Sequence, residues 1–140
     1  MYTLVILPHL DDEFALSPVL HDIHLKSKGS FKIIFCAERN KNSKKNRIKR
    51  RKETINSMKI FNIDLKDIIF LNDEIFVDDL KLINSCAKIY NFLKNFYLKY
   101  SINKIYTLNL EGGHPDHDAL AILIDNFSKE FSIKKYFFPA

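Results

Sequence analysis

The chain has 140 residues, of which 46% are apolar and 28% charged, with only three Gly and four Pro. This composition excludes a disordered or low-complexity protein, and the length predicts a single domain, residues 1–140. No stretch approaches the ~20 apolar residues that a transmembrane helix needs, and no secretory signal is present, so we expect a cytoplasmic protein without a membrane span.

Apolar runs and helical patterns alternate along the chain and predict strands and helices in turn. We expect strands over residues 2–7, 31–36, 67–71, 104–110 and 135–138. Helices are expected over residues 13–28, 43–61, from a cap at Asp78 or Asp79 to about 100, and 114–130. Asn62 is expected to end the second helix, because Asn tolerates the left-handed conformation. The alternation indicates an α/β fold: a Rossmann-like, doubly wound, mostly parallel sheet of about five strands with helices on both faces.

Two polar segments directly follow predicted strands. They are His9-Leu10-Asp11-Asp12-Glu13, after the first strand, and Gly112-Gly113-His114-Pro115-Asp116-His117, after the fourth. Because the carboxyl ends of parallel strands share one edge of a sheet, the two segments can face each other across one site. Two His and one Asp from such a pair suit a catalytic zinc, which takes three protein ligands and keeps a position for water.

Each segment also has a simpler explanation when it is taken alone. The acidic run after His9 is typical of a helix N-terminus, and Pro115 with its neighbouring histidines is typical of a polar first turn. Their joint occurrence favours a metal site, because three of the five histidines and a doubled Asp lie at two strand ends. We expect Zn²⁺ as the cofactor, and Fe²⁺ stays an alternative because the same donor set suits it.

A basic cluster accounts for the net charge of +5; its members are Lys41, Lys44, Lys45, Arg47, Lys49, Arg50, Arg51 and Lys52. Such a cluster is most often a solvated helix face. It can also contact phosphates, so attraction of a phosphorylated or nucleotide-linked sugar is an open alternative. We expect no nucleic-acid partner, because the sequence contains no recognised nucleic-acid module.

The two polar segments together resemble the motifs of the PIG-L/LmbE-like family of zinc-dependent de-N-acetylases, which includes N-acetylglucosaminyl-phosphatidylinositol de-N-acetylase. The family's motifs read His-Pro-Asp-Asp-Glu and His-Pro-Asp-His, and residues 9–13 and 114–117 match them apart from Leu10. A weaker pattern, Arg-x-x-Glu in the second helix, matches Arg50 and Glu53. The resemblance covers nearly the whole chain in order and spacing.

The resemblance implies a zinc-dependent N-deacetylase, a hydrolase of a linear amide bond, whose substrate is an N-acetylglucosamine-type sugar conjugate. It assigns the metal ligands by position as His9, Asp12 and His117. Asp11 is then the general base, and a protonated His114 stabilises the oxyanion or protonates the leaving amine. Arg50 is expected near a polar or phosphate group of the substrate.

Two departures from the family pattern bear on the pocket. Leu10 replaces the usual Pro, which predicts a less rigid turn. Family members continue past the strand over 135–138, whereas this chain stops at Ala140 and is short at its C-terminus. We therefore expect either a truncated protein or a homo-oligomer or partner subunit that completes the pocket. The alternative function is a non-catalytic or partner-dependent remnant of the family that binds metal or sugar.

Overall fold

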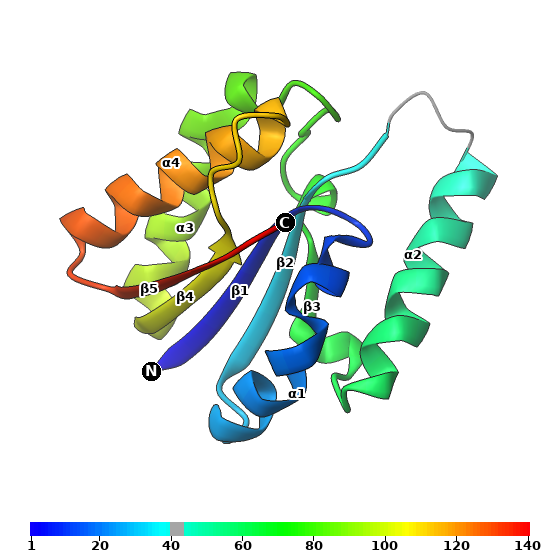
Figure 1. The fold of residues 1–140 in the computed structure, drawn as a ribbon, viewed down its shortest axis with the longest axis horizontal. Helices are drawn as coiled ribbons and strands as arrows, with labels where there is room; N and C mark the ends of the chain where they lie inside the picture. The colour runs from blue at the N-terminus through cyan, green and yellow to red at the C-terminus, as the bar shows by residue number, and fades with distance from the viewer. Residues whose placement is uncertain (40–43) are drawn as a thin grey trace.

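The computed structural model describes residues 1–39 and 44–140 and contains a parallel sheet of five strands in that part of the chain. The strands are β1 (Tyr2–His9), β2 (Phe31–Ala37), β3 (Ile68–Phe70), β4 (Ile102–Leu108) and β5 (Lys134–Phe138). Their order across the sheet is β3-β2-β1-β4-β5, and every neighbouring pair runs parallel (Figure 1). The predicted α/β fold with a parallel, doubly wound sheet is therefore confirmed.

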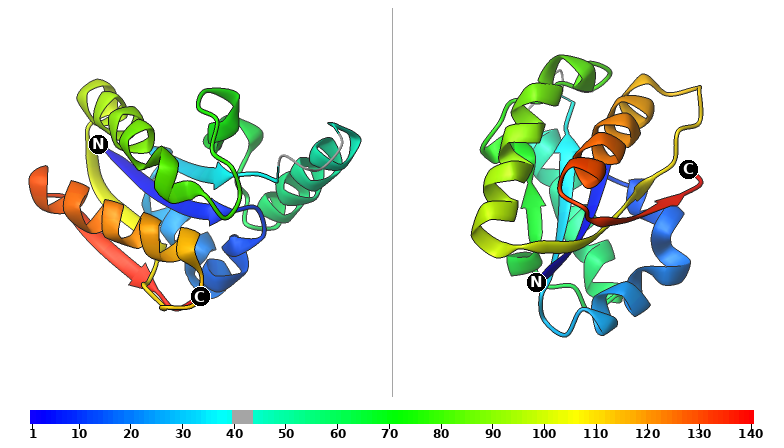
Figure 2. Two further views of the ribbon diagram at one scale, coloured as in Figure 1. Left: turned by 90° about the horizontal axis from the view of Figure 1, so that it is seen from above. Right: turned by 90° about the vertical axis from the view of Figure 1, so that its left-hand side faces the viewer.

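Helices cover both faces of the sheet, as predicted. The main helices are α1 (Ser17–Lys26), α2 (Lys44–Ile60), α3 (Cys86–Tyr100) and α4 (Pro115–Glu130). In β1, Leu4 and Ile6 belong to the apolar core beneath α3 and α4, whereas Val5 and Leu7 belong to the core beneath α1 and α2 (Figure 2). Within the described ranges, no helix combines the length and apolarity needed to cross a bilayer.

Helix α3 begins later than the sequence predicted. It starts at Cys86, after a short 3-10 turn over Leu82–Ser85, and no side chain caps it. Asp78 instead forms an isolated parallel bridge with Glu38, and Asp79 contacts His9. The prediction that Asp78 or Asp79 caps this helix is wrong, because contacts with distant strand ends determine where both residues lie.

The predictions for the ends of the other helices were partly right. The predicted first helix is split into a 3-10 turn over Asp12–Leu16 and α1. Asn62 does end α2: its φ is 59°, and the Ile63 amide donates to the Met58 carbonyl at 3.1 Å. Ser43, the predicted start of this helix, and Lys41 of the basic cluster lie outside the described residues.

The sheet opens between β1 and β4. Their ladder ends at the pair Val5–Tyr106, although β1 continues beside β2 to His9 and β4 continues beside β5 to Leu108. After β1 the chain crosses over to β2, and after β4 it crosses over to β5. These two connections therefore run to opposite sides of the opening. Ligands bind at such a switch point in parallel sheets, so the end of β1 and the segment after β4 border a natural site.

Ion pairs of Arg51 fasten α2 to the sheet. Only two residues of α2, Thr54 and Met58, are buried, so the helix gains little from apolar burial. The Arg51 guanidinium donates to both carboxylate oxygens of Glu38, at 2.7 and 2.5 Å, and to Asp73 at 2.8 Å. Glu38 directly follows β2 and is 5% exposed, so these bonds join α2 to the carboxyl edge of the sheet.

We predict that Arg51→Met lowers the free energy of unfolding by about 3 kcal/mol, because it leaves the buried Glu38 carboxylate without its partner. Urea denaturation monitored by circular dichroism measures the change. Lys49→Met, on an exposed position of the same helix, is the control and should stay within about 0.5 kcal/mol of wild type. Equal stability of the two variants would contradict a stabilising role for the Arg51 ion pairs.

Candidate metal centre

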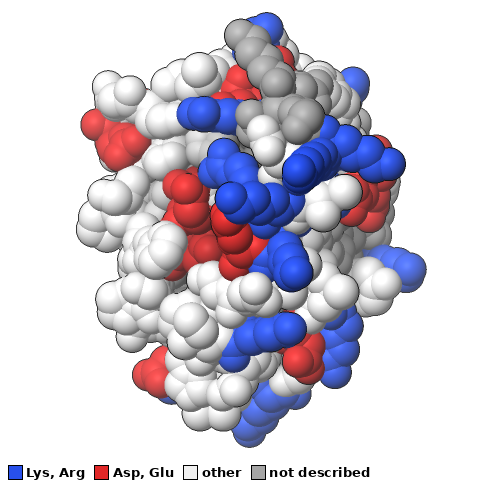
Figure 3. All heavy atoms as spheres, turned by 90° about the vertical axis from the view of Figure 1, so that its right-hand side faces the viewer, with Lys and Arg blue, Asp and Glu red and all other residues white. Residues whose placement is uncertain are grey.

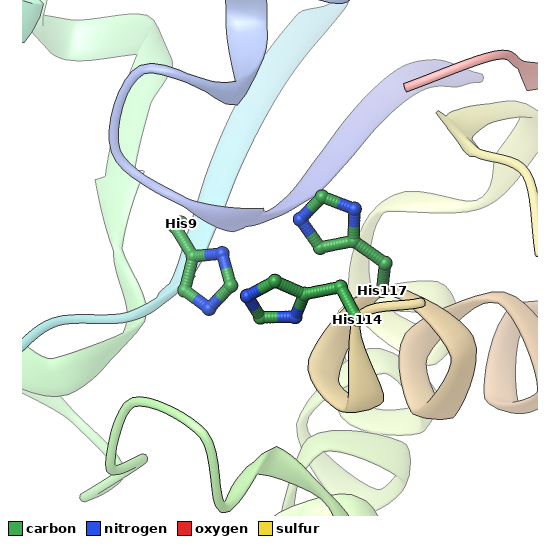
Figure 4. A group of neighbouring side chains, drawn as sticks. All are labelled: His9, His114 and His117. Atoms are coloured by element: carbon green, nitrogen blue, oxygen red, sulfur yellow. The ribbon is translucent and has the colours of Figure 1, made fainter. Parts of the chain in front are cut away.

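Three histidines from the two polar segments lie together at the switch point. His9 ends β1, whereas His114 and His117 lie at the start of α4 (Figure 4). The ring centroids of His9 are 4.9 Å from His114 and 5.5 Å from His117, and the latter two rings stack at 4.3 Å. One nitrogen from each ring lies within 4.8 Å of the others, so the group could hold a metal ion.

The carboxylate of Asp12 lies between two of these rings. Its Oδ2 is 3.3 Å from His9 Nδ1 and also accepts the backbone N–H of His9 at 2.8 Å. Its Oδ1 is 3.5 Å from His117 Nε2. The structure therefore brings His9, Asp12 and His117 into one place, with two imidazoles and one carboxylate as donors.

The turn that presents these groups is anchored in the core and strained at Asp11. Leu10 is 4% exposed and belongs to the same apolar core as Leu7 and Leu16, so its side chain holds the turn despite the missing Pro. Asp11 has a φ of 78°, a left-handed conformation that Asp adopts more readily than most residues. Burial raises the pKa of the Asp11 carboxyl, and the nearby Arg50 charge opposes this shift.

Asp116 joins three segments of the site. It is 1% exposed, and its Oδ2 lies 2.8 Å from His9 Nε2. The backbone amides of Leu80 and Leu82 donate to its two oxygens at 2.7 and 3.0 Å. The sequence gives no sign of these contacts, because both amides lie more than thirty residues away along the chain.

Asp79 is a second residue that the sequence analysis did not place in the site. Its Oδ1 is 3.1 Å from His9 Nε2, and its Oδ2 accepts a hydrogen bond from Arg39 at 2.9 Å. With His9 and Asp116 it forms another group that could hold a metal ion. No local pattern signalled this, since Asp79 resembled a helix cap.

The carboxylates around His9 favour its protonated form in the metal-free protein. Burial lowers the pKa of His9, but hydrogen bonds with Asp12 and Asp116, and the charges of both, outweigh it, so the pKa is raised. The site thus attracts positive charge at this imidazole. A divalent cation there would supply that charge in place of the proton.

The other two histidines are oriented by different contacts. His114 caps α4, because its Nδ1 accepts the backbone N–H of Asp116 at 3.3 Å. His117 Nδ1 is buried and has no hydrogen bond, although Glu111 Oε1 lies 3.0 Å away. A buried ring nitrogen without a hydrogen bond is unusual in a stable core and typical of a functional site. The donor set fits a metal centre, and the His117 nitrogen that faces Asp12 is Nε2 rather than the unsatisfied Nδ1.

A cavity of about 160 Å³ opens beside the histidines. Its lining includes His9, Asp11, Asp79, His114, Arg47 and Arg50. Arg50 Nη2 is 3.5 Å from Asp11 Oδ2, so the predicted substrate-contacting residue does lie at the site. Figure 3 shows acidic side chains on this side of the molecule directly beside Lys and Arg side chains.

The family model PIG-L, described as GlcNAc-PI de-N-acetylase, matches residues 4–128. No curated protein matches the sequence. Several solved structures share the fold. N,N'-diacetylchitobiose deacetylase from Pyrococcus horikoshii is 19% identical, with a TM-score of 0.68 over 91% of this chain and 49% of its own.

Two other solved structures are similar over more of their length. The conserved protein TT1542 from Thermus thermophilus is 19% identical, with a TM-score of 0.72 over 99% of this chain and 66% of its own. The zinc-inhibited form of teicoplanin deacetylase Orf2 is 14% identical, with a TM-score of 0.68, and the match covers 96% of this chain and 66% of that protein. The chain thus spans between about half and two thirds of these proteins.

We predict that Asp116→Asn lowers the pKa of His9 in the metal-free protein, because the variant removes a charge that favours the imidazolium. A histidine whose pKa is raised in the folded protein stabilises the fold at pH values below its ordinary pKa. This stabilisation is lost as the pH rises through the pKa of the folded state. The variant should therefore be destabilised more at about pH 5 than at about pH 8.

Histidine ring signals followed by NMR titration in the presence of a chelator give the pKa, and urea denaturation at both pH values gives the stability. Asp22→Asn removes an exposed carboxylate far from the site and is the control. A His9 pKa that is unchanged in Asp116→Asn would contradict the role given to this carboxylate.

Proposed function

The chain belongs to the PIG-L family, and on that premise we propose that it is a zinc-dependent N-deacetylase that acts on an N-acetylated amino sugar conjugate. It hydrolyses the linear amide bond of an N-acetylglucosamine-type group and releases acetate and a free amine. One observation carries the proposal: Asp12 contacts both His9 and His117 at the switch point of the sheet, where His9 also lines a cavity. The similar deacetylase structures support this reaction class.

We assign His9, Asp12 and His117 as the residues that hold the metal. Asp12 contacts both imidazoles, and this donor set suits zinc and also ferrous iron. When bound, zinc at such a site supplies a water of lowered pKa and polarises the acetyl carbonyl.

Asp11 is proposed to move the proton, and His114 is proposed to stabilise the oxygen that becomes negative. Asp11 lines the cavity, and its raised pKa suits a carboxylate that takes the proton of the attacking water. The cap on α4 assigns a lone pair to His114 Nδ1, so Nε2 bears the proton. Nε2 then donates a hydrogen bond to the oxygen that becomes negative. The proton that Asp11 takes from the water passes to the leaving amine.

Acetate release from N-acetylglucosamine and from N,N'-diacetylchitobiose tests the function. We expect release that a chelator abolishes and that zinc restores at up to one equivalent per chain. Higher zinc is avoided, because one similar structure is a zinc-inhibited form. Failure to release acetate from these or related N-acetyl sugars, with one zinc bound per chain, would contradict the proposal and favour a non-catalytic remnant.

We predict that Asp11→Asn and His114→Ala each lower kcat by about 100- to 10,000-fold while zinc stays bound, because proton transfer or stabilisation of the oxyanion is lost but the assigned ligands remain. Acetate release and elemental analysis on the same samples measure both effects. Asn keeps the left-handed backbone at position 11, so Asp11→Asn tests the carboxylate rather than the turn. Loss of zinc from His114→Ala would instead place His114 among the ligands.

A further inference from the structure

The two ring nitrogens of His117 face two different carboxylates. The side chain extends from the first turn of α4 toward the end of β1 (Figure 4). Its Nε2 lies 3.5 Å from Asp12 Oδ1, and its Nδ1 lies 3.0 Å from Glu111 Oε1. Because Nδ1 is buried from solvent, Glu111 is the acidic group that this nitrogen meets. The distance is that of a hydrogen bond, and a rotation of the Glu111 carboxylate, 34% exposed, would align it with an N–H at Nδ1.

Glu111 has no competing cationic partner. In the described ranges, 1–39 and 44–140, its carboxylate pairs with His117 and with no Lys or Arg. The position of this carboxylate therefore serves the histidine rather than an ion pair elsewhere on the surface.

Asp118 holds the backbone that carries Glu111. Its Oδ1 accepts the backbone N–H of Glu111 at 2.9 Å and that of Gly112 at 3.1 Å. Gly112 has a φ of 74°, a left-handed conformation that glycine adopts without strain, so the segment can turn toward α4. Asp118 directly follows His117 in the same helix. One turn of α4 therefore positions both the histidine and the segment that carries its acidic neighbour.

The contact with Glu111 determines which nitrogen of His117 is available to a metal. A neutral imidazole has one N–H and one lone pair, so a histidine that binds a metal through Nε2 carries its proton at Nδ1. A carboxylate beside Nδ1 favours this tautomer, fixes the orientation of the ring and raises the basicity of the other nitrogen. The Glu111 contact is shorter than the Asp12 contact, 3.0 against 3.5 Å, so the proton is favoured at Nδ1.

We propose that Glu111 is a positioning residue for the metal centre: its carboxylate accepts the Nδ1–H of His117, keeps the Nε2 lone pair on the side of Asp12 and so raises the affinity for a divalent cation. This inference rests on the metal site of the proposed function and adds a residue that lies outside both histidine motifs.

Zinc affinity measured by competition with a chelating dye tests the proposal. Glu111→Ala should weaken zinc binding about 10- to 100-fold, because the carboxylate partner of a metal-binding histidine contributes that much. Glu111→Gln should lose less, since its amide oxygen still accepts a hydrogen bond. Glu74→Ala, which removes an exposed glutamate that lines a different cavity, is the control. Wild-type affinity in Glu111→Ala would overturn the inference and leave the deacetylase function standing.

A double variant tests the part given to Asp118. Asp118→Ala should also weaken zinc binding, because the segment that carries Glu111 loses two anchoring hydrogen bonds. Combined with Glu111→Ala, it should cause little further loss, since Asp118 acts through Glu111. Additive losses would overturn this role of Asp118.

NMR of isotope-labelled ring nitrogens in the presence of a chelator, at a pH at which His117 is neutral, gives a readout independent of metal and of catalysis. We expect the Nδ1–H tautomer of His117 to predominate in wild type and to lose population in Glu111→Ala. The same tautomer in both proteins would overturn the inference even if zinc affinity fell, because the lost charge alone would then explain the fall. A tautomer that depends on Glu111, in a chain that takes up no zinc, would support the contact with His117 and count against the proposed function.

Discussion

The contact between His9 and Asp116 holds the parts of the site in one place. The Asp116 carboxylate, 1% exposed, binds the His9 ring and the backbone amides of Leu80 and Leu82. It therefore joins the end of β1, the start of α4 and the segment before α3. Hydrogen bonds to a charged group are strong in such surroundings, and the positions of His114 and His117 follow from this fixed start of α4.

The fold contributes the space and the walls of the site. Beyond Val5 the first and fourth strands no longer pair, so the two polar segments can meet at the carboxyl edge of the sheet. Arg51 fixes α2 through the buried Glu38 carboxylate, and the same helix carries Arg47 and Arg50 along the cavity. The helix that Arg51 fastens to the sheet therefore also forms a wall of the cavity.

The sequence predicted the strands, the parallel sheet and the meeting of the two segments, because hydrophobic periodicity and parallel crossovers leave few other arrangements. It could not predict the role of Asp116, whose partners are backbone amides of a distant segment. The role of Asp79 was predicted wrongly for the same reason, because the sequence alone does not distinguish an Asp that caps a helix from one that contacts the distant His9. Replacement of Pro by Leu10 suggested a loose turn, yet burial of the side chain anchors it.

We propose that two segments about a hundred residues apart form one metal centre. Zinc bound per chain after equilibrium dialysis, compared between wild type, His9→Ala and His117→Ala, tests it most directly. We expect about one zinc in wild type and a large loss in each variant, because either segment alone supplies too few ligands. Retention of zinc in both variants, or no uptake by a folded wild-type chain at neutral pH, would contradict the claim.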